Sequence, residues 1–313
     1  MSAVPLLEVR GLSRRFGKFT AVHDLSFRVS PGEIWGFIGP NGAGKTTTMR
    51  ICATLDLPSQ GDVLVDGLSV LADPGHARAK IGFMPDALGT YADTTIEEYL
   101  DFYARAAGLR GAEREQRIQS VAEFTELGHL MDRMMNSLSK GMSQRLCLAK
   151  TLLHDPKLLI LDEPASGLDP RARVEFRELI RALADQGKAV LISSHILSEL
   201  SETCDGVVVI EGGRLVREGH VATLASDLSQ HEMLYLRCLA DPDQVEIALA
   251  EQAGVLQTRA DGDNFIVEFA GDEEQIAALL AALVERGLRP VEFRWHRIDL
   301  EELFLSFTEG RLQ

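Results

Sequence analysis

Alternating apolar and polar positions fill the first part of the chain, and this period-2 pattern predicts β-strands. Residues 7–10 alternate strictly, and residues 21–29 place four apolar side chains at strand spacing. The pair Asp66-Gly67 lies between two further short runs and predicts a tight hairpin. More continuous apolar runs follow at 34–38, 81–84, 158–161 and 189–192. We expect these runs to form buried strands.

Between residues 95 and 153 the apolar spacing becomes helical. Thr95 and Glu98 form a capping box, in which the two side chains satisfy free N–H groups at a helix start. Apolar residues then recur three and four positions apart through residues 118–127. Ser139 is a good N-cap ahead of another helix with an apolar face. We therefore expect a helical subdomain at about 88–155, inserted between strands.

A composition break predicts a second domain after residue 224. Residues 225–313 hold 18 acidic residues, seven arginines and no lysine, so they carry −11 of the net charge of −15. The apolar pattern predicts strand, helix, strand, strand, helix and strand at 233–239, 243–252, 255–258, 265–269, 273–286 and 290–295, with a last short helix at 300–307. The order βαββαβ is that of the ferredoxin-like fold. We expect domains at 1–224 and 225–313, the second a small α+β domain.

The composition is that of an ordinary globular chain and excludes several classes. A net charge of −15 argues against a surface for nucleic acid or anionic lipid. The longest apolar run, at 276–284, is far shorter than the ~20 residues of a membrane span, and the N-terminus does not resemble a signal peptide. The four cysteines are far apart and lack metal-ligand spacing, which is typical of reduced thiols in the cytosol.

Residues 34–49, IWGFIGPNGAGKTTTM, join a predicted strand, a glycine-rich turn and a helix start. They match the G-x-x-x-x-G-K-[ST] phosphate-binding pattern in the context that supports it. Glycines let successive N–H groups point at phosphate oxygens, and the helix N-terminus adds partial positive charge. Lys45 can reach the β- and γ-phosphates, and the Thr46 hydroxyl can ligate Mg²⁺. The chain is therefore predicted to bind a nucleoside triphosphate.

Two acids end a second apolar strand, in the sequence LILDEP at 159–164. Because side chains alternate along a strand, Asp162 and Glu163 point differently. Asp162 can hold Mg²⁺ through its water shell, and Glu163 can orient an attacking water. His195 follows a third such strand, and ligands of open α/β sheets bind at that carboxyl edge. These residues predict the hydrolytic half of a P-loop ATPase site.

Five ordered motifs resemble those of an ATP-binding cassette (ABC) ATPase subunit. They are GPNGAGKTT at 39–47, LSKGMSQR at 138–145, LILDEP at 159–164, SGLD at 166–169 and SSH at 193–195. The resemblance covers about residues 6–222. It implies an α/β P-loop NTPase fold with a mixed sheet core, an antiparallel β subdomain and a helical subdomain. The C-terminal piece ending in residues 299–304 resembles the accessory domain on ATPases of drug- and antibiotic-type (ABC-2) exporters.

The resemblance implies a role for each matching residue. Phe16 would stack on adenine, with Val22 near the ribose. The triphosphate would be held by Gly39, Pro40, Asn41, Gly42, Ala43, Gly44, Lys45, Thr46 and Thr47. The Mg²⁺ ligands would be Thr46, Asp86 and Asp162. Glu163 would polarise the hydrolytic water, and His195 would contact the γ-phosphate and Glu163. The residues facing the γ-phosphate of the opposite subunit would be Ser139, Gly141 and Met142, with Asp169 at the same interface.

Two positions depart from the family pattern. Asp86 stands where glutamine is usual, at a residue that ordinarily ligates Mg²⁺ and senses the permease. Aspartate is a good Mg²⁺ ligand but a shorter one. The signature reads LSKGM rather than LSGGQ, so Lys140 and Met142 replace a glycine and an amide. We expect hydrolysis of ATP to survive both changes.

The resemblance implies the ATPase half of an ABC exporter. We expect a homodimer with composite ATP sites, using ATP and Mg²⁺, bound to a separately encoded membrane permease. The protein would be cytoplasmic and peripheral on the inner face of the membrane. One alternative is a soluble ABC ATPase that remodels a macromolecular assembly, because fold does not fix function. Another is an ATP-sensing interaction module with weak turnover, suggested by Asp86 and the altered signature.

Overall fold

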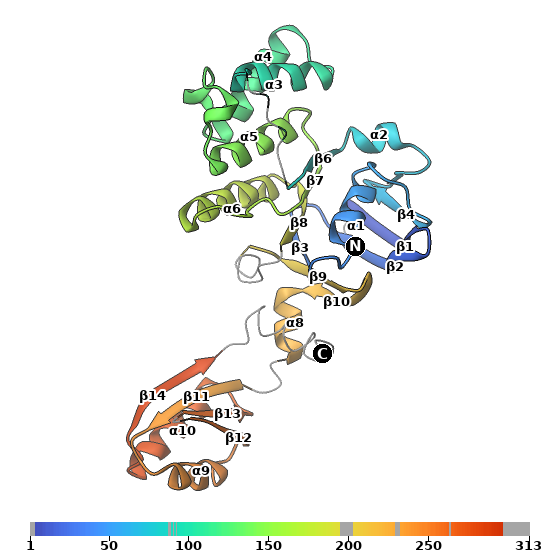
Figure 1. Cartoon of the computed structure of the whole chain (residues 1–313). Coiled ribbons are helices and arrows are strands. Elements are labelled where there is room, and N and C mark those ends of the chain that lie inside the picture. The colour runs from blue at the N-terminus through green and yellow to red at the C-terminus, as the bar shows by residue number, and fades with distance from the viewer. Residues whose placement is uncertain are drawn as a thin grey trace. The chain divides into compact units, whose positions relative to one another are not determined.

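The chain separates into two compact units, Met1–Val221 and Ala222–Gln313, each with its own hydrophobic core (Figure 1). The computed structural model describes residues 4–86, 89, 91, 93–194, 203–228, 232–262 and 264–296. Within these ranges, no helix combines the length and apolar content needed to cross a bilayer.

A six-stranded sheet forms the centre of the first unit. Its strands are β3 (Ile34–Ile38), β6 (Ile81–Met84), β7 (Leu158–Leu161), β8 (Ala189–Ser194), β9 (Gly206–Glu211) and β10 (Arg214–His220). Their order is β10-β9-β3-β8-β7-β6, and every neighbouring pair is parallel except β9 and β10. All residues of β3, β7 and β8 are buried, as expected for strands covered on both faces.

This strand order brings together the ends of four strands that lie far apart in sequence. The carboxyl ends of parallel strands meet at one edge of the sheet, so the residues after β3, β6 and β7 share that edge with the last residues of β8. The N–H of Asp162 donates to the carbonyl of Met84 at 2.8 Å and fixes the end of β7 beside that of β6.

A second, antiparallel sheet packs on the first and has the order β2-β1-β4-β5. Its strands are β1 (Leu7–Phe16), β2 (Phe19–Val29), β4 (Gln60–Val65) and β5 (Leu68–Ser69). Phe27 of β2 meets Phe37 of β3 with ring centroids 5.6 Å apart. The predicted Asp66-Gly67 hairpin is confirmed, and both turn residues have positive φ. Phe16 is the last residue of β1, rather than part of a segment between strands as the sequence suggested.

Six α-helices surround the two sheets in the described part of this unit. They are α1 (Lys45–Cys52), α2 (Pro74–Arg78), α3 (Ile96–Ala106), α4 (Gly111–Phe124), α5 (Lys140–Leu152) and α6 (Pro170–Asp185). Helices α3, α4 and α5 pack on one another and form the green cluster of Figure 1. The capping box of Thr95 and Glu98 is present, and Ser139 caps α5. Helix α6 was not predicted, although Asp169 and Pro170 make a strong helix start.

The second unit has the βαββαβ order that the sequence predicted. Its elements are β11 (Glu232–Cys238), α9 (Pro242–Ala250), β12 (Val255–Asp261), β13 (Asn264–Phe269), α10 (Glu273–Glu285) and β14 (Pro290–His296). The strands form an antiparallel sheet in the order β12-β13-β11-β14. Leu234, Phe265 and Phe269 share a core with Val245 and Leu283 of the two helices. Helix α8 (Val221–Leu228) begins at the boundary between the units. The helix predicted at 300–307 and the stretch 299–304 lie outside the described residues.

Candidate functional site

The turn between β3 and α1 is shaped by its glycines. Gly42 has φ of 80° and Gly44 has φ of 101°, a region that other residues rarely adopt. A Cβ on Gly44 would also lie 2.6 Å from the carbonyl oxygen of Ala21, and one on Gly39 would collide with the carbonyl oxygen of Ile210. The turn is therefore pressed against β2 and β9, and only glycine fits at these two contacts.

Lys45 lies almost fully buried within this turn. Its ammonium donates to the carbonyl of Gly39 at 2.6 Å and to that of Pro40 at 3.3 Å. Its Nζ is 3.9 Å from Oε1 of Glu163. Thr46, the next residue, is exposed at the first turn of α1. The Lys45 ammonium, fixed by two carbonyl oxygens beside the N-terminus of α1, attracts phosphate oxygens.

Two acids and one serine are joined at the edge of the sheet. Asp162 is buried, and its Oδ1 accepts a hydrogen bond of 2.7 Å from the Ser193 hydroxyl. The same hydroxyl accepts a hydrogen bond of 2.9 Å from the N–H of Glu163. Glu163 has φ of 49°, a strained value for its residue type. Ser193 was not among the predicted site residues. It occupies the end of β8, where the rule that ligands bind at strand ends could have identified it.

Most of the predicted nucleotide-binding residues line one cleft of about 680 Å³. The predicted residues in its lining are Phe16, Pro40, Asn41, Gly42, Ala43, Gly44, Lys45, Thr46, Thr47, Asp86 and Glu163. Phe19, Ala21, Lys140 and Ser166 also line it and were not predicted. Phe19 pairs directly with Phe16 across the β1–β2 hairpin, so the two aromatics are neighbours at the mouth of the cleft.

Some predicted residues lie elsewhere. Val22 is buried beneath Gly44 and does not line the cleft, and Gly39 and Asp162 lie behind its surface. His195 lies outside the described residues. The aromatic ring of Phe16 is exposed, and the guanidinium of Arg14 lies 4.5 Å from its centroid.

A second cavity of about 340 Å³ holds the remaining predicted residues. They are Ser139, Gly141, Met142 and Asp169. Ser139 accepts from the N–H of Met142 at 3.3 Å, and Asp169 accepts from the N–H of Ala172 at 2.9 Å. The two side chains thus cap α5 and α6, whose N-termini face the same cavity. Lys140 lines both this cavity and the cleft.

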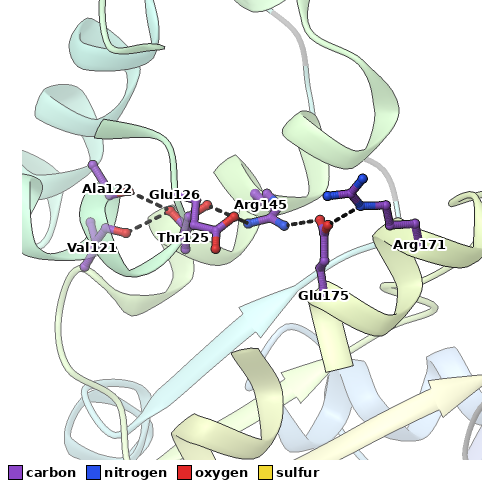
Figure 2. A network of polar contacts seen from close by, with 7 residues as sticks. All are labelled: Val121, Ala122, Thr125, Glu126, Arg145, Arg171 and Glu175. Atoms are coloured by element: carbon purple, nitrogen blue, oxygen red, sulfur yellow. Dashed lines mark hydrogen bonds and ion pairs between the residues drawn. The ribbon is translucent and has the colours of Figure 1, made fainter. Parts of the chain in front are cut away.

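Arg145 joins the helices on either side of the second cavity (Figure 2). From α5 its guanidinium donates to Glu126, after α4, and to Glu175 of α6, both at 2.7 Å. It also donates to the carbonyl of Thr125 at 3.3 Å, and Arg171 approaches Glu175 from the other side at 2.9 Å. The guanidinium is nearly buried, with 12% of the side chain exposed. Arg145 therefore holds the N-terminal half of α5 against the N-terminal half of α6.

The oxygen donors of the predicted metal site suit Mg²⁺. Within the described ranges, no group of three or more His, Cys, Asp or Glu residues could hold a metal ion by itself. The hydroxyl of Thr46 and the carboxylates of Asp86 and Asp162 are hard oxygen donors. Mg²⁺ usually takes one or two carboxylates and completes its shell with water and substrate phosphates, so a sparse set of this kind fits it.

None of the four cysteines lines this cleft. Burial raises the pKa of the Cys52 thiol, in α1, to about 12, and burial also raises the pKa of the Cys147 thiol in α5. A thiol attacks only as its thiolate, so both are inert near neutral pH. The chemistry of the cleft is therefore that of Lys45, the hydroxyls and the carboxylates.

Comparison with known proteins gives a consistent result. The family model described as "ABC transporter" matches residues 22–166. The chain is 33% identical to the Nod factor export ATP-binding protein I of Ralstonia nicotianae, over 98% of this chain and 95% of that protein. It is 34% identical to the protein of the same name in Rhizobium etli, over 100% and 95% of the two chains. A solved structure of the ATP-binding subunit of an ABC transporter is 30% identical, with a TM-score of 0.65, over 79% of this chain and 100% of that one.

The buried phosphate-binding turn, the paired acids at the neighbouring strand end and these matches along almost the whole chain agree. The chain belongs to the ATP-binding subunits of ABC transporters, which bind ATP and hydrolyse it.

Proposed function

We propose that the protein powers an exporter as a homodimer with two composite ATP sites. The observation that carries this proposal is the division of the expected site residues between two cavities of one chain. Ser139 and Asp169 line a cavity that lacks the phosphate-binding turn, whereas Lys45 and Glu163 line a cleft that lacks Ser139. Two chains related by a two-fold axis can complete both sites at once, since such an interface is self-complementary.

Within each composite site the residues of the cleft act on the nucleotide of their own chain. Phe16 stacks on the base, Lys45 and the N–H groups of the turn bind the triphosphate, and Glu163 orients the attacking water. The same site uses His195 beside the γ-phosphate. The second chain supplies Ser139, Gly141, Met142 and Asp169. Val22 supports the turn from below rather than contacting the ribose, because it is buried under Gly44.

Mg²⁺ is the proposed second cofactor. Thr46, Asp86 and Asp162 would hold it beside the phosphates, the last through water because its carboxylate is buried and already accepts from Ser193. The ion supplies charge neutralisation on the phosphates. The aspartate at 86 brings a charged ligand where the family usually has a neutral amide, so its contact with Mg²⁺ is expected to be stronger but shorter in reach.

A separately encoded permease is the proposed partner, and through it the protein would sit on the cytoplasmic side of a membrane. The relatives that match along the whole chain are named export ATP-binding proteins. This supports export rather than a soluble remodelling factor. We also propose residues 1–224 as the nucleotide-binding domain, with its helical subdomain at about 88–155. Residues 225–313 would form an accessory domain, and the separation into two compact units supports that division.

The decisive experiment uses Glu163→Gln, which keeps the cleft but removes the carboxylate that orients water. Tagged variant protein is recovered from detergent-solubilised host membranes with ATP and Mg²⁺, and the partners are identified by mass spectrometry. We expect a closed dimer with a polytopic membrane protein in near-equal amount. Lys45→Ala is the matched control, because it should lose ATP binding and with it the trapped dimer. Recovery of soluble proteins alone from both variants would contradict the proposal and favour the remodelling factor.

A further inference from the structure

Lys140 stands at an unusual position in the structure. It is the first residue of α5, yet its side chain runs away from that helix and across Gly167 in the loop before α6. A Cβ built on Gly167 would collide with the Nζ of Lys140 and would lie 3.2 Å from its Cε. Gly167 also has φ of 68°, so glycine is needed there both for the turn and for the passage of the lysine.

Lys140 lines the nucleotide cleft of its own chain. The charged residues that line this cleft are Lys45, Lys140, Asp86 and Glu163. Lys45 is already held by two carbonyl oxygens and lies 3.9 Å from Glu163. Lys140 makes no hydrogen bond or ion pair with any residue in the described part of the chain. It is therefore an uncommitted cation at the edge of an anion-binding cleft.

The end of the cleft that Lys140 enters is defined by its neighbours. Phe16 and Phe19 come from the β1–β2 hairpin, whereas Glu163 and Ser166 follow β7 at the edge of the parallel sheet. Lys140 lies beside Gly167 and so approaches from the side of Ser166. In the proposed binding mode the base contacts Phe16, which leaves the terminal phosphate toward Glu163. A lysine there faces the part of the nucleotide that ATP has and ADP lacks.

We propose that Lys140 binds the terminal phosphate of the nucleotide held by its own chain. Its ammonium pairs with that phosphate before two chains meet and so favours ATP over ADP at the monomer stage. This inference rests on the proposed binding mode in the cleft. Arg145 keeps the lysine in place, since its bond to Glu175 fixes the start of α5 beside the loop that Lys140 crosses.

Affinity of the monomer for two nucleotides tests the proposal. The full chain is titrated with ADP and with the non-hydrolysable analogue AMP-PNP, at a concentration where sedimentation shows monomers. Lys140→Met keeps the length and helix propensity of the side chain but removes its charge. We expect this variant to bind AMP-PNP about fivefold more weakly than the wild type and to bind ADP with an affinity within about twofold of the wild type. This is the effect of losing a charge-assisted contact at a partly screened site. Lys140→Arg should retain the preference.

The matched control is Lys18→Met. Lys18 is exposed in the hairpin between Phe16 and Phe19, at the other end of the cleft, so the change of net charge is the same. It should not alter the ratio of the two affinities. The proposal would be overturned if Lys140→Met lowered the affinities for AMP-PNP and ADP equally, or if its effect were no larger than that of Lys18→Met.

The same titrations distinguish a failure of the proposed role of Lys140 from a failure of the proposed binding mode. If the wild-type chain binds neither nucleotide, the proposed binding mode is wrong. If the wild type binds both nucleotides and Lys140→Met has the same ratio of AMP-PNP affinity to ADP affinity, only the role of Lys140 is wrong. If Lys140→Met leaves the monomer unchanged but weakens the ATP-dependent dimer of Glu163→Gln, the lysine acts across the interface, and the assignment to its own chain is overturned.

Discussion

The hydroxyl of Ser193 lies 2.7 Å from Oδ1 of Asp162 and donates to it, although 31 residues separate the two in sequence. Both groups are buried at the edge of the parallel sheet. Because the same hydroxyl accepts from the N–H of Glu163, one serine holds the carboxylate of Asp162 and the backbone of Glu163. A side chain that touches two functional groups in this way positions them without acting on the substrate.

Ser193→Ala should therefore slow hydrolysis more than it weakens binding. The change removes the hydrogen bond that the buried carboxylate of Asp162 accepts and the one that the N–H of Glu163 donates. Steady-state assays should show kcat reduced about tenfold with the ATP affinity within about twofold, and urea unfolding should show a loss of ~1–3 kcal/mol. Ser137→Ala removes an exposed hydroxyl that does not line the cleft and should change neither quantity. A fall in ATP affinity equal to the fall in kcat would contradict the positioning role.

Two glycines of the turn should respond differently to alanine. Both have positive φ, but a Cβ on Gly44 would lie 2.6 Å from the carbonyl of Ala21, whereas one on Gly42 would meet open space. Gly42→Ala should cost only the backbone strain, about 1–2 kcal/mol. Gly44→Ala should cost clearly more, because β2 or α1 must shift, and should abolish ATP binding. Thermal unfolding and ATP titration of both variants check this, and equal losses in stability would contradict it.

Asp86 should set the Mg²⁺ requirement of the reaction. Asp86→Ala removes one of the proposed oxygen donors, and the Mg²⁺ concentration for half-maximal ATPase activity should rise severalfold. Asp86→Asn keeps an oxygen donor without the charge and should give an intermediate value. The measurement is the ATPase rate at saturating ATP across a Mg²⁺ series. An unchanged series for Asp86→Ala would remove this residue from the metal site.

The bond between Arg145 and Glu175 should show a measurable coupling. A double-mutant cycle with Arg145→Ala and Glu175→Ala isolates it, and we expect a favourable coupling because the Arg145 guanidinium is nearly buried. Arg171 contacts the same carboxylate from a side chain that is 90% exposed, so the cycle with Arg171→Ala should give less. Urea unfolding supplies the free energies. Equal couplings for the two arginines would show that burial of Arg145 has no influence.

Asp66 should make stability depend on acid pH. Its carboxylate accepts from Lys80 at 2.6 Å and from Lys157 at 2.9 Å, and these bonds lower the pKa of Asp66, Lys80 most of all. A lowered folded-state pKa gives stability that is present above the unfolded pKa of about 3.9 and is lost as pH falls through the folded value.

Asp66→Asn tests that contribution cleanly, because asparagine tolerates the positive φ of this turn. The variant should be less stable than the wild type at pH 7, and the difference should shrink as pH falls below about 4. Urea unfolding at both pH values measures it. A difference that stays constant across this range would show that the charge of Asp66 is not the source of the stability.

Local patterns in the sequence predicted the elements that depend on neighbours in the chain. The turn at 39–44, the caps Thr95 and Ser139 and the Asp66-Gly67 hairpin each need only a few consecutive residues, and all have the expected local structure. The βαββαβ order of the second unit followed from apolar spacing for the same reason. Helix α6 was not predicted, although its buried residues Phe176, Ile180 and Leu183 recur at helical spacing.

Relations between distant residues were decided by the tertiary structure. The buried place of Val22 depends on how β2 packs under the turn, and the pairing of Phe19 with Phe16 depends on the register of the β1–β2 hairpin. The order β3-β8-β7-β6 brings Ser193 to Asp162, and the packing of α5 on the loop before α6 brings Lys140 to the cleft.

The amino-acid sequence by itself determined that the chain carries a phosphate-binding turn, a pair of acids and two capped helix starts, because each is written in consecutive residues. Only the tertiary structure decided which of these groups share a cavity. Contacts across a sheet edge or between helices depend on strand order and packing, and a one-dimensional pattern does not contain those distances.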